Sequence, residues 1–215
     1  AFSNKAGLFN IGCEGQLYIG ALTATATALA MQGLPRFLVI LVSFLTGMMS
    51  GALVGGFNGL LKAKLNINEV LVAIMLNYIM KFFASYCVHG PMKDPKSKVM
   101  QSPSIGQEYM LTKILPKSQL TTALILGLIL AALLYVFINK TRAGFALRAV
   151  GENGSAAQAA GISMVKTVII TMAASGAIAA LTGVTEVFGK TGKFVDGFSP
   201  GYGFTGIAVA VLGNN

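Results

Sequence analysis

Long apolar stretches alternate with shorter polar segments along most of the sequence. A helix needs about 20 apolar residues to cross a hydrocarbon core roughly 30 Å thick. Stretches of about this size, almost free of charge, lie at 16–34, 37–61, 69–88, 120–138 and 167–187. A shorter apolar run after Gly203 predicts part of one more span. We therefore expect an all-α, polytopic transmembrane helical bundle with about five complete spans and a partial sixth, formed by a single domain over residues 1–215 that is truncated at both ends.

Three polar segments separate these spans. Residues 90–119 carry four prolines and five lysines, the last of them Lys117, which predicts a sizeable loop outside the membrane. Residues 139–166 form the second polar segment, and the glycine-rich residues 189–203 form the third. Basic residues occur on both sides, but long loops count less in the positive-inside rule, which favours a cytoplasmic position for the side that carries Arg148.

The composition indicates that a lipid bilayer is the solvent of this chain. Of its 215 residues, 54% are hydrophobic and only 11% are charged, which is more apolar surface than a soluble domain of this size could bury. The net charge of +9 does not predict a nucleic-acid partner, because the basic residues lie between apolar runs and form no single basic face. Cys13 and Cys87 have no neighbouring ligand pattern, so we expect them to pack and predict no metal site.

Small residues recur at helical spacing within two of the expected spans. Their faces allow another helix backbone to approach closely, which is how helices associate in lipid. We predict helix packing at Gly47, Gly51, Gly55 and Gly59 in the second span, and at Ser175, Ala179 and Gly183 in the fifth. Such faces are structural by default, and they imply a compact bundle without defining a solute pathway.

Several polar residues lie within or beside apolar runs, where an unpaired polar group is costly and usually faces the bundle interior. The candidates for a translocation pathway are Asn10, Glu14, Gln16, Asn58 and Asn77. Asn77 lies in the middle of a span, where it either bonds to another helix or lines a solute route, and the sequence favours neither. Glu14 and Glu186 are more typical of interface positions.

Sequence motifs of catalysis are absent. The chain has no HExxH or GxSxG pattern, and the stretch 183–191 misses a phosphate-binding loop because five residues separate its glycines where four are required. We therefore expect no catalytic residue in this chain. Uphill transport of a solute would need energy from a partner subunit or from an ion gradient.

The segment around Glu152 predicts a short, smooth helix. Asn153 or Ser155 can cap its start, the alanines from Ala156 favour helix, and Gly161 suits a left-handed position at its end. Glu152 is expected at the N-terminal end of this helix, where its charge suits the helix dipole. Such a helix could dock in a groove of another protein, or simply link two spans.

The same segment resembles a known family. It reads Arg-Ala-Val-Gly-Glu-Asn at 148–153, followed by paired alanines and Ala-Gly-Ile at 160–162, which is similar to the cytoplasmic coupling loop of permeases of ABC importers in the branched-chain amino acid and ribose group. The nucleoside and simple-sugar permeases served by basic membrane lipoproteins are the most similar subgroup. Further similar segments follow in the same order, at 4–16, 60–64, 68–70, 75–79, 90–95, 175–177 and 201–209. Departures are Gly154 for a common proline, Gln158 for a common arginine and Lys81 at a usually apolar position.

This resemblance implies a membrane-spanning permease that moves a nucleoside or a simple sugar by alternating access. Its coupling loop, 139–166, would face the cytoplasm and contact an ABC ATPase through Arg148, Gly151, Glu152, Asn153, Ala156, Ala157 and Gly161. The loop 90–119 would be extracytoplasmic and meet a substrate-binding lipoprotein. A second permease subunit would complete the pore in the bacterial inner membrane. ATP and magnesium would bind the partner subunits, and this chain would need no cofactor.

Two other functions remain open at this stage. An ion-coupled secondary transporter would need coupling charges or broken helices near mid-membrane, and only the glycine-rich stretch after Phe198 hints at the latter. The second open function is an ABC permease of the same group that is specific for branched-chain amino acids. No residue of the sequence identifies the solute.

Overall fold

The computed structural model describes residues 2–114 and 118–213, so Lys117 of the expected loop lies outside the described residues. The described chain is helical, which confirms the expected all-α class. Eight α-helices follow one another: α1 (Cys13–Ala30), α2 (Arg36–Leu65), α3 (Glu69–His89), α4 (Ala123–Lys140), α5 (Arg142–Glu152), α6 (Gly154–Ala159), α7 (Met164–Glu186) and α8 (Tyr202–Leu212). Three short helices complete the fold, namely η1 (Ser3–Ala6), η2 (Gln107–Tyr109) and the π-helix η3 (Val187–Thr191).

Four of the described helices are long and apolar enough to cross a membrane. They are α2, α3, α4 and the continuous helix Met164–Thr191 formed by α7 and η3, while α8 is a shorter apolar helix. The expected count of five complete spans is therefore not confirmed. The missing one is α1, whose first turn contains Glu14 and Gln16 and whose remainder is rich in alanine and threonine. This helix can be less apolar because it is shielded from lipid by its neighbours.

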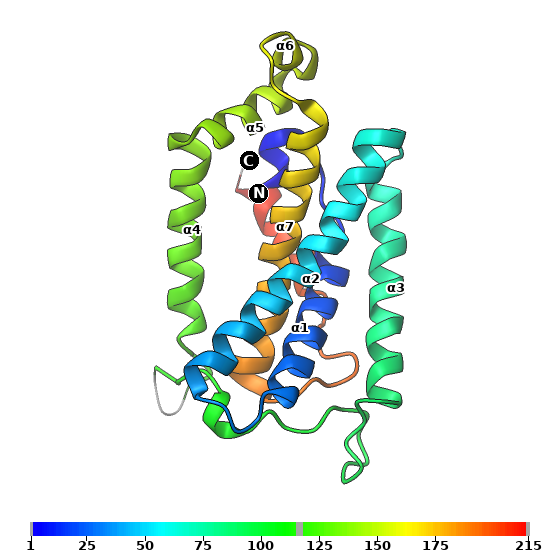
Figure 1. The fold of residues 1–215 in the computed structure, drawn as a ribbon, viewed down its shortest axis with the longest axis vertical. Helices are drawn as coiled ribbons and strands as arrows, with labels where there is room; N and C mark the ends of the chain where they lie inside the picture. Colours follow the sequence, from blue (N-terminus) through cyan, green and yellow to red (C-terminus); the bar gives the residue numbers. More distant parts are fainter. Residues whose placement is uncertain (1, 115–117, 214–215) are drawn as a thin grey trace.

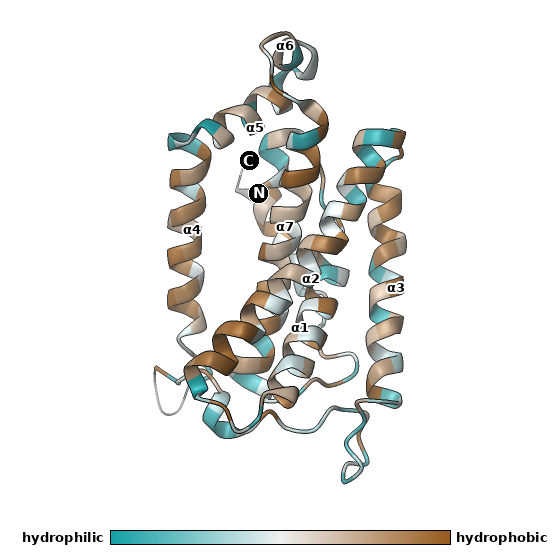
Figure 2. Ribbon diagram, in the orientation of Figure 1, coloured by the Kyte–Doolittle hydropathy of each residue, from teal (hydrophilic) through white to brown (hydrophobic). Residues whose placement is uncertain are grey.

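Helix α1 is the centre of the bundle and packs against α2, α3 and α7 (Figure 1). Its side chains Leu17, Tyr18, Ala21 and Ala24 are almost fully buried. Helix α4 is the opposite case, because it stands apart at the edge of the bundle and none of its residues is buried within the described chain. Figure 2 shows that α4 is among the most hydrophobic helices, as expected of a surface that meets lipid or another apolar helix.

Helices α2 and α7 approach each other at backbone distance. A Cβ atom on Gly51 would overlap the carbonyl oxygen of Gly176, and one on Gly55 would overlap the carbonyl oxygen of Met172. A Cβ on Gly176 would in turn overlap the carbonyl oxygen of Gly51. Gly47 and Gly59 lie on the same face of α2 and also meet α7. Larger side chains at these positions would separate the two helices.

Polar side chains set where several helices begin. The side chain of Asn68 accepts a hydrogen bond from Val70 N at 2.9 Å and so caps α3, as Thr141 caps α5 and Ser163 caps α7. Helix α2 ends at Asn66 in a left-handed conformation with φ 50°. Asn66 is therefore the C-cap of α2, and Asn68 is the N-cap of α3.

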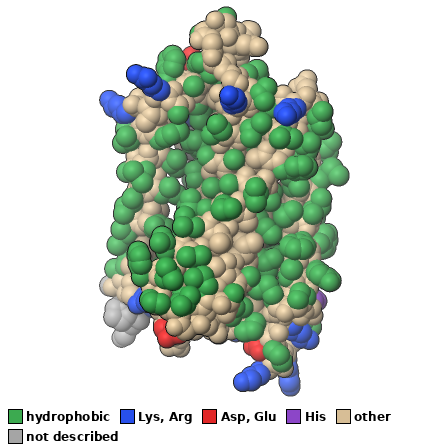
Figure 3. All heavy atoms as spheres, viewed as in Figure 1, with side chains coloured by type: hydrophobic (Ala, Val, Ile, Leu, Met, Phe, Trp, Pro, Cys, Tyr) green, Lys and Arg blue, Asp and Glu red, His purple; other side chains and the backbone are tan. Residues whose placement is uncertain are grey.

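The two largest polar segments lie at opposite ends of the bundle. Helices α5 and α6 close one end, and the loop 90–119 lies at the other end beside the glycine-rich segment after η3 (Figure 1). The loop and that segment are joined by hydrogen bonds from Ser102 N to Phe194 O (2.8 Å) and from Ile105 N to Gly192 O (2.9 Å). In the view of Figure 3, lysine and arginine side chains gather at the two ends, and hydrophobic side chains cover the sides between them. This distribution suits a protein that crosses a bilayer.

The backbone contact of α2 and α7 generates a prediction about stability. Gly51→Ala and Gly176→Ala should each destabilise the folded protein by about 1–3 kcal/mol, because the added methyl group overpacks the contact. The matched control is Gly127→Ala in α4, where a Cβ would meet nothing within 4 Å. Thermal unfolding of the purified protein in detergent should show a lower Tm for the first two variants only. An equal response of all three variants would contradict this packing.

Candidate functional site

Asn10 lies at the centre of a buried polar cluster that joins the start of α1 to α7. Its side-chain Nδ2 donates to Ser175 Oγ at 2.8 Å and to Gln16 Oε1 at 3.0 Å. Its Oδ1 accepts from Gly12 N at 3.0 Å and from Gln16 Nε2 at 3.3 Å. The structure thus brings together two of the residues predicted for the pathway, Asn10 and Gln16, with Ser175, which the sequence assigned to packing. Both ends of the Asn10 amide are engaged in holding the helices.

Asn77 of α3 fixes the first turn of α1. Its Oδ1 accepts from Gly15 N at 2.7 Å, and its Nδ2 donates to Ile11 O at 3.0 Å. A Cβ atom on Gly15 would come within 2.8 Å of Asn77 Cα, so the two helices are in close contact here. These bonds correspond to the first interpretation of Asn77, a hydrogen-bonded contact between helices.

Glu14 joins the beginnings of α1 and α8. Its carboxylate, on a residue only 8% exposed, accepts from Ser199 Oγ at 2.6 Å and from Gly203 N at 2.8 Å. Gly203 lies in the first turn of α8, where the helix dipole stabilises a negative charge, and Ser199 lies just before that helix. The chain around this carboxylate is irregular on both sides, before Cys13 and before Tyr202. Glu14 is therefore buried inside the bundle.

Asn58 lies apart from this group. Its Nδ2 donates to Glu69 O at 3.2 Å, at the turn between α2 and α3, where Lys62 and Glu69 form an ion pair at 3.0 Å. The five candidates for the pathway therefore divide into four around the start of α1 and one at the α2–α3 turn.

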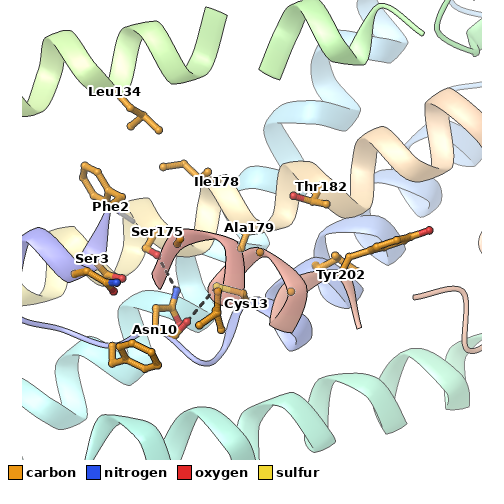
Figure 4. A pocket seen from close by; sticks show the side chains of 17 residues that line it. Phe2, Ser3, Asn10, Cys13, Leu134, Ser175, Ile178, Ala179, Thr182 and Tyr202 are labelled. Carbon is orange, nitrogen blue, oxygen red and sulfur yellow. Dashed lines mark hydrogen bonds between the residues drawn. The ribbon is translucent and has the colours of Figure 1, made fainter. Parts of the chain in front are cut away.

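A cavity of about 220 Å³ lies between α1, α7, α8, α4 and η1. Of the five predicted pathway residues, Asn10 lines it, together with Cys13, Ser175, Ala179, Thr182 and Tyr202. Figure 4 shows Thr182 and Tyr202 at one end of this cavity and Phe2 and Ser3 at the other, with the bond between Asn10 and Ser175 in between. Sequence reasoning missed Thr182 and Tyr202. A signal for Thr182 was present, because Ser175, Ala179 and Thr182 share one face of a helix at spacings of four and three.

The segment predicted to contact an ATPase projects from one end of the bundle as α5 and α6 (Figure 1). Asn153 caps α6 by accepting hydrogen bonds from Ala156 N at 3.1 Å and from Ser155 Oγ at 2.7 Å. Gly161 adopts the expected left-handed conformation with φ +81°. Ala156 is exposed and Ala157 is buried, so the short helix presents one alanine face outward and one inward.

One detail of this segment differs from the sequence expectation. Glu152 directly precedes Asn153, the N-cap of α6, but it is also the last residue of α5, so its charge lies at the C-terminal end of that helix as well. The reason is that Asn153 serves as both the C-cap of α5 and the N-cap of α6. Gly151 faces η1, since a Cβ there would overlap the carbonyl oxygen of Lys5. Arg148 is partly buried, and its Nε makes no hydrogen bond to any described residue.

Comparison with known proteins places this architecture in a family. Residues 1–215 match the model of the permease component of the branched-chain amino acid transport system. The chain is 39% identical to the guanosine ABC transporter permease protein NupP of Bacillus subtilis. The alignment covers 100% of this chain and 62% of the relative.

Two further relatives are similar over the same length. The nucleoside ABC transporter permease protein NupB of Lactococcus lactis is 36% identical, over 100% of this chain and 62% of the relative. The glucose ABC transporter permease protein TsgB13 of Haloferax volcanii is 35% identical, over 98% of this chain and 58% of the relative. The chain thus spans about three fifths of the length of these relatives. No solved structure matches it. With the match extending from the first residue to the last, this multi-pass chain belongs to the family of permease components of branched-chain amino acid transport systems.

Proposed function

We propose that this chain is the membrane-spanning part of an ABC importer that moves a nucleoside or a simple sugar into the cell. The observation that carries the proposal is the family match over all 215 residues. The names of the relatives, which are nucleoside, guanosine and glucose permeases, support this class of solute. The projecting α5–α6 segment supports the mode of action, because it offers a short exposed helix to a partner at one end of the bundle.

The packing of the bundle suggests how motion passes from that helix to the interior. Helix α6 is followed directly by α7, which contacts α1 and α2 along its length. At Gly51, Gly55 and Gly176 the backbones of α7 and α2 meet directly, without a long side chain between them. When two partner ATPases bind ATP and magnesium and close, a displacement of α6 would therefore move α7 with its neighbours. Alternating access of the interior would follow from this rigid-body motion.

The proposal also assigns sides to the bundle. The end with α5 and α6 would lie in the cytoplasm, with Arg148, Glu152 and Ala156 at the ATPase interface. The loop 90–119 would face outward and receive solute from a substrate-binding lipoprotein. In the bacterial inner membrane, α1 would act as a fifth span despite its lower hydropathy, α8 would form part of a sixth, and a second permease subunit would complete the pore.

The source of energy is the first test. In cells that express the complete transporter, uptake of labelled uridine or guanosine should persist when proton and sodium gradients are collapsed and ATP is maintained. Unlabelled nucleoside, ribose and leucine are then added as competitors to identify the solute class. The nucleoside or the sugar should reduce uptake of the label, and leucine should not. Uptake that stops when the ion gradients collapse at constant ATP would instead indicate a secondary transporter.

The exposed alanine of α6 is the second test. Ala156→Trp should lower ATP-dependent uptake at least about tenfold, because a bulky side chain prevents α6 from seating in a groove of the ATPase. The matched control is Ala131→Trp at an exposed position of α4. Membrane levels of both variants are measured by immunoblot, and uptake by isotope accumulation. Normal uptake by Ala156→Trp would rule out α6 as the contact.

A further inference from the structure

A second cavity, of about 440 Å³, opens beside the start of α4, toward the end of the bundle that carries the loop 90–119. Its walls come from the end of α7, from η3 and from the first turns of α4 and α8. Most of the residues that line it are polar, although they lie among apolar helices: Gln119, Thr121, Thr182, Thr185, Glu186, Lys190, Tyr202 and Thr205. π-Helical turns such as η3 are frequently found at functional sites.

Glu186 organises one wall of this cavity. Its Oε1 accepts a hydrogen bond from Lys190 Nζ at 2.8 Å and a longer one from the Tyr202 hydroxyl at 3.5 Å. Its other carboxylate oxygen, Oε2, has no partner among the described residues. The residue is half-buried, so this oxygen is an acceptor that a solute could reach from the cavity.

Thr182 adds a second unused group. Its hydroxyl makes no hydrogen bond within the part of the chain that the structure describes, whereas the hydroxyls of Thr185 and Thr205 donate to backbone carbonyls. Thr182 and Tyr202 line both this cavity and the 220 Å³ cavity described above. The two cavities therefore adjoin at this pair of side chains, which Figure 4 shows at one end of the smaller cavity.

A simple surface ion pair does not account for these features. Glu186 and Lys190 are four residues apart, which is the spacing of an ordinary helix pair. Yet the wall around them also carries four threonines and the Tyr202 hydroxyl, and polar groups of this kind are costly against lipid. Their gathering indicates a water-filled cavity that a polar solute can enter.

We propose that this 440 Å³ cavity is an outer binding site for a neutral solute rich in hydroxyl groups, and that Tyr202 and Thr182 separate it from the deeper cavity. The inference rests on the proposed transport function. Glu186 Oε2 accepts a hydrogen bond from a solute hydroxyl, and Thr182 supplies a second hydrogen bond. The ion pair with Lys190 balances the charge of Glu186, so the site suits a neutral ribose or hexose better than an ion. Volumes of this order are typical of small-molecule sites.

Transport kinetics test the two contacts. Glu186→Gln and Thr182→Val in the complete transporter should each raise the KM for uptake about tenfold, which corresponds to the loss of one hydrogen bond of the substrate, with the maximal rate retained. The matched control is Thr167→Val, which removes a threonine hydroxyl of the same helix α7 outside both cavities and should leave KM unchanged.

Thiol labelling tests the same site without relying on uptake. In a Cys13→Ala, Cys87→Ala background, Thr205→Cys should react with a water-soluble thiol reagent added from outside, and uridine or glucose should protect it. Leu128→Cys, on the exposed face of α4, is the control and should not react.

The outcomes separate this inference from the proposed function. Unchanged KM in both variants with ATP-driven uptake intact, or labelling of Thr205→Cys that neither uridine nor glucose affects, overturns the binding site and leaves the transport function standing. Solute protection combined with uptake that depends on an ion gradient retains the site and overturns the ABC mechanism.

Discussion

The close backbone contact between α2 and α7 is the constraint on which the rest of the structure depends. Gly51, Gly55 and Gly176 bring the two helices together without intervening side chains. In lipid, where apolar side chains gain little by leaving the acyl chains, contact of this kind supplies the attraction between helices by van der Waals packing. Helix α1 packs against both partners, so the three helices form one unit. The projecting α5–α6 segment is attached to one end of α7, and η3 and the start of α8 follow the other end.

Around this unit, the faces of α7 have different surroundings. Gly176 and Ala180 contact α2, whereas Ser175, Ala179 and Thr182 line the smaller cavity. A buried carboxylate then sets where α8 begins, because Glu14 binds Ser199 and the backbone of Gly203. In the proposed transporter, one helix would thus be in contact with the ATPase-facing segment, the rigid packing surface and the solute route.

Much of the fold follows from apolar length alone, but the partners of individual residues do not. The runs over α2, α3, α4 and α7 are recognisable because a bilayer demands about 20 apolar residues. The buried helix α1 is less distinct, since its neighbours and not lipid surround it. In α7, small residues occur on several faces. The predicted packing residue Gly183 meets the backbone of α1, where a Cβ would overlap the carbonyl oxygen of Leu17, whereas the face that meets α2 lies at Gly176 and Ala180. Asn58 lies at the α2–α3 turn, far from the polar cluster around Asn10. This distance is set by the packing of the helices, which the local sequence around either residue does not predict. The N-cap at Asn153 was predicted, whereas the helix α5 that ends at the same residue was not, because one residue caps two helices.

The central claim, that α6 is the surface on which a partner ATPase acts, can be measured directly by cross-linking. In the Cys13→Ala, Cys87→Ala background, a benzophenone reagent attached to Ala156→Cys should cross-link to the ATPase subunit of the assembled transporter on illumination, with a yield that changes when ATP binds. The same reagent on Ser97→Cys, in the loop at the opposite end, should give no such product. A cross-link to the ATPase from position 97 and none from position 156 would contradict the account.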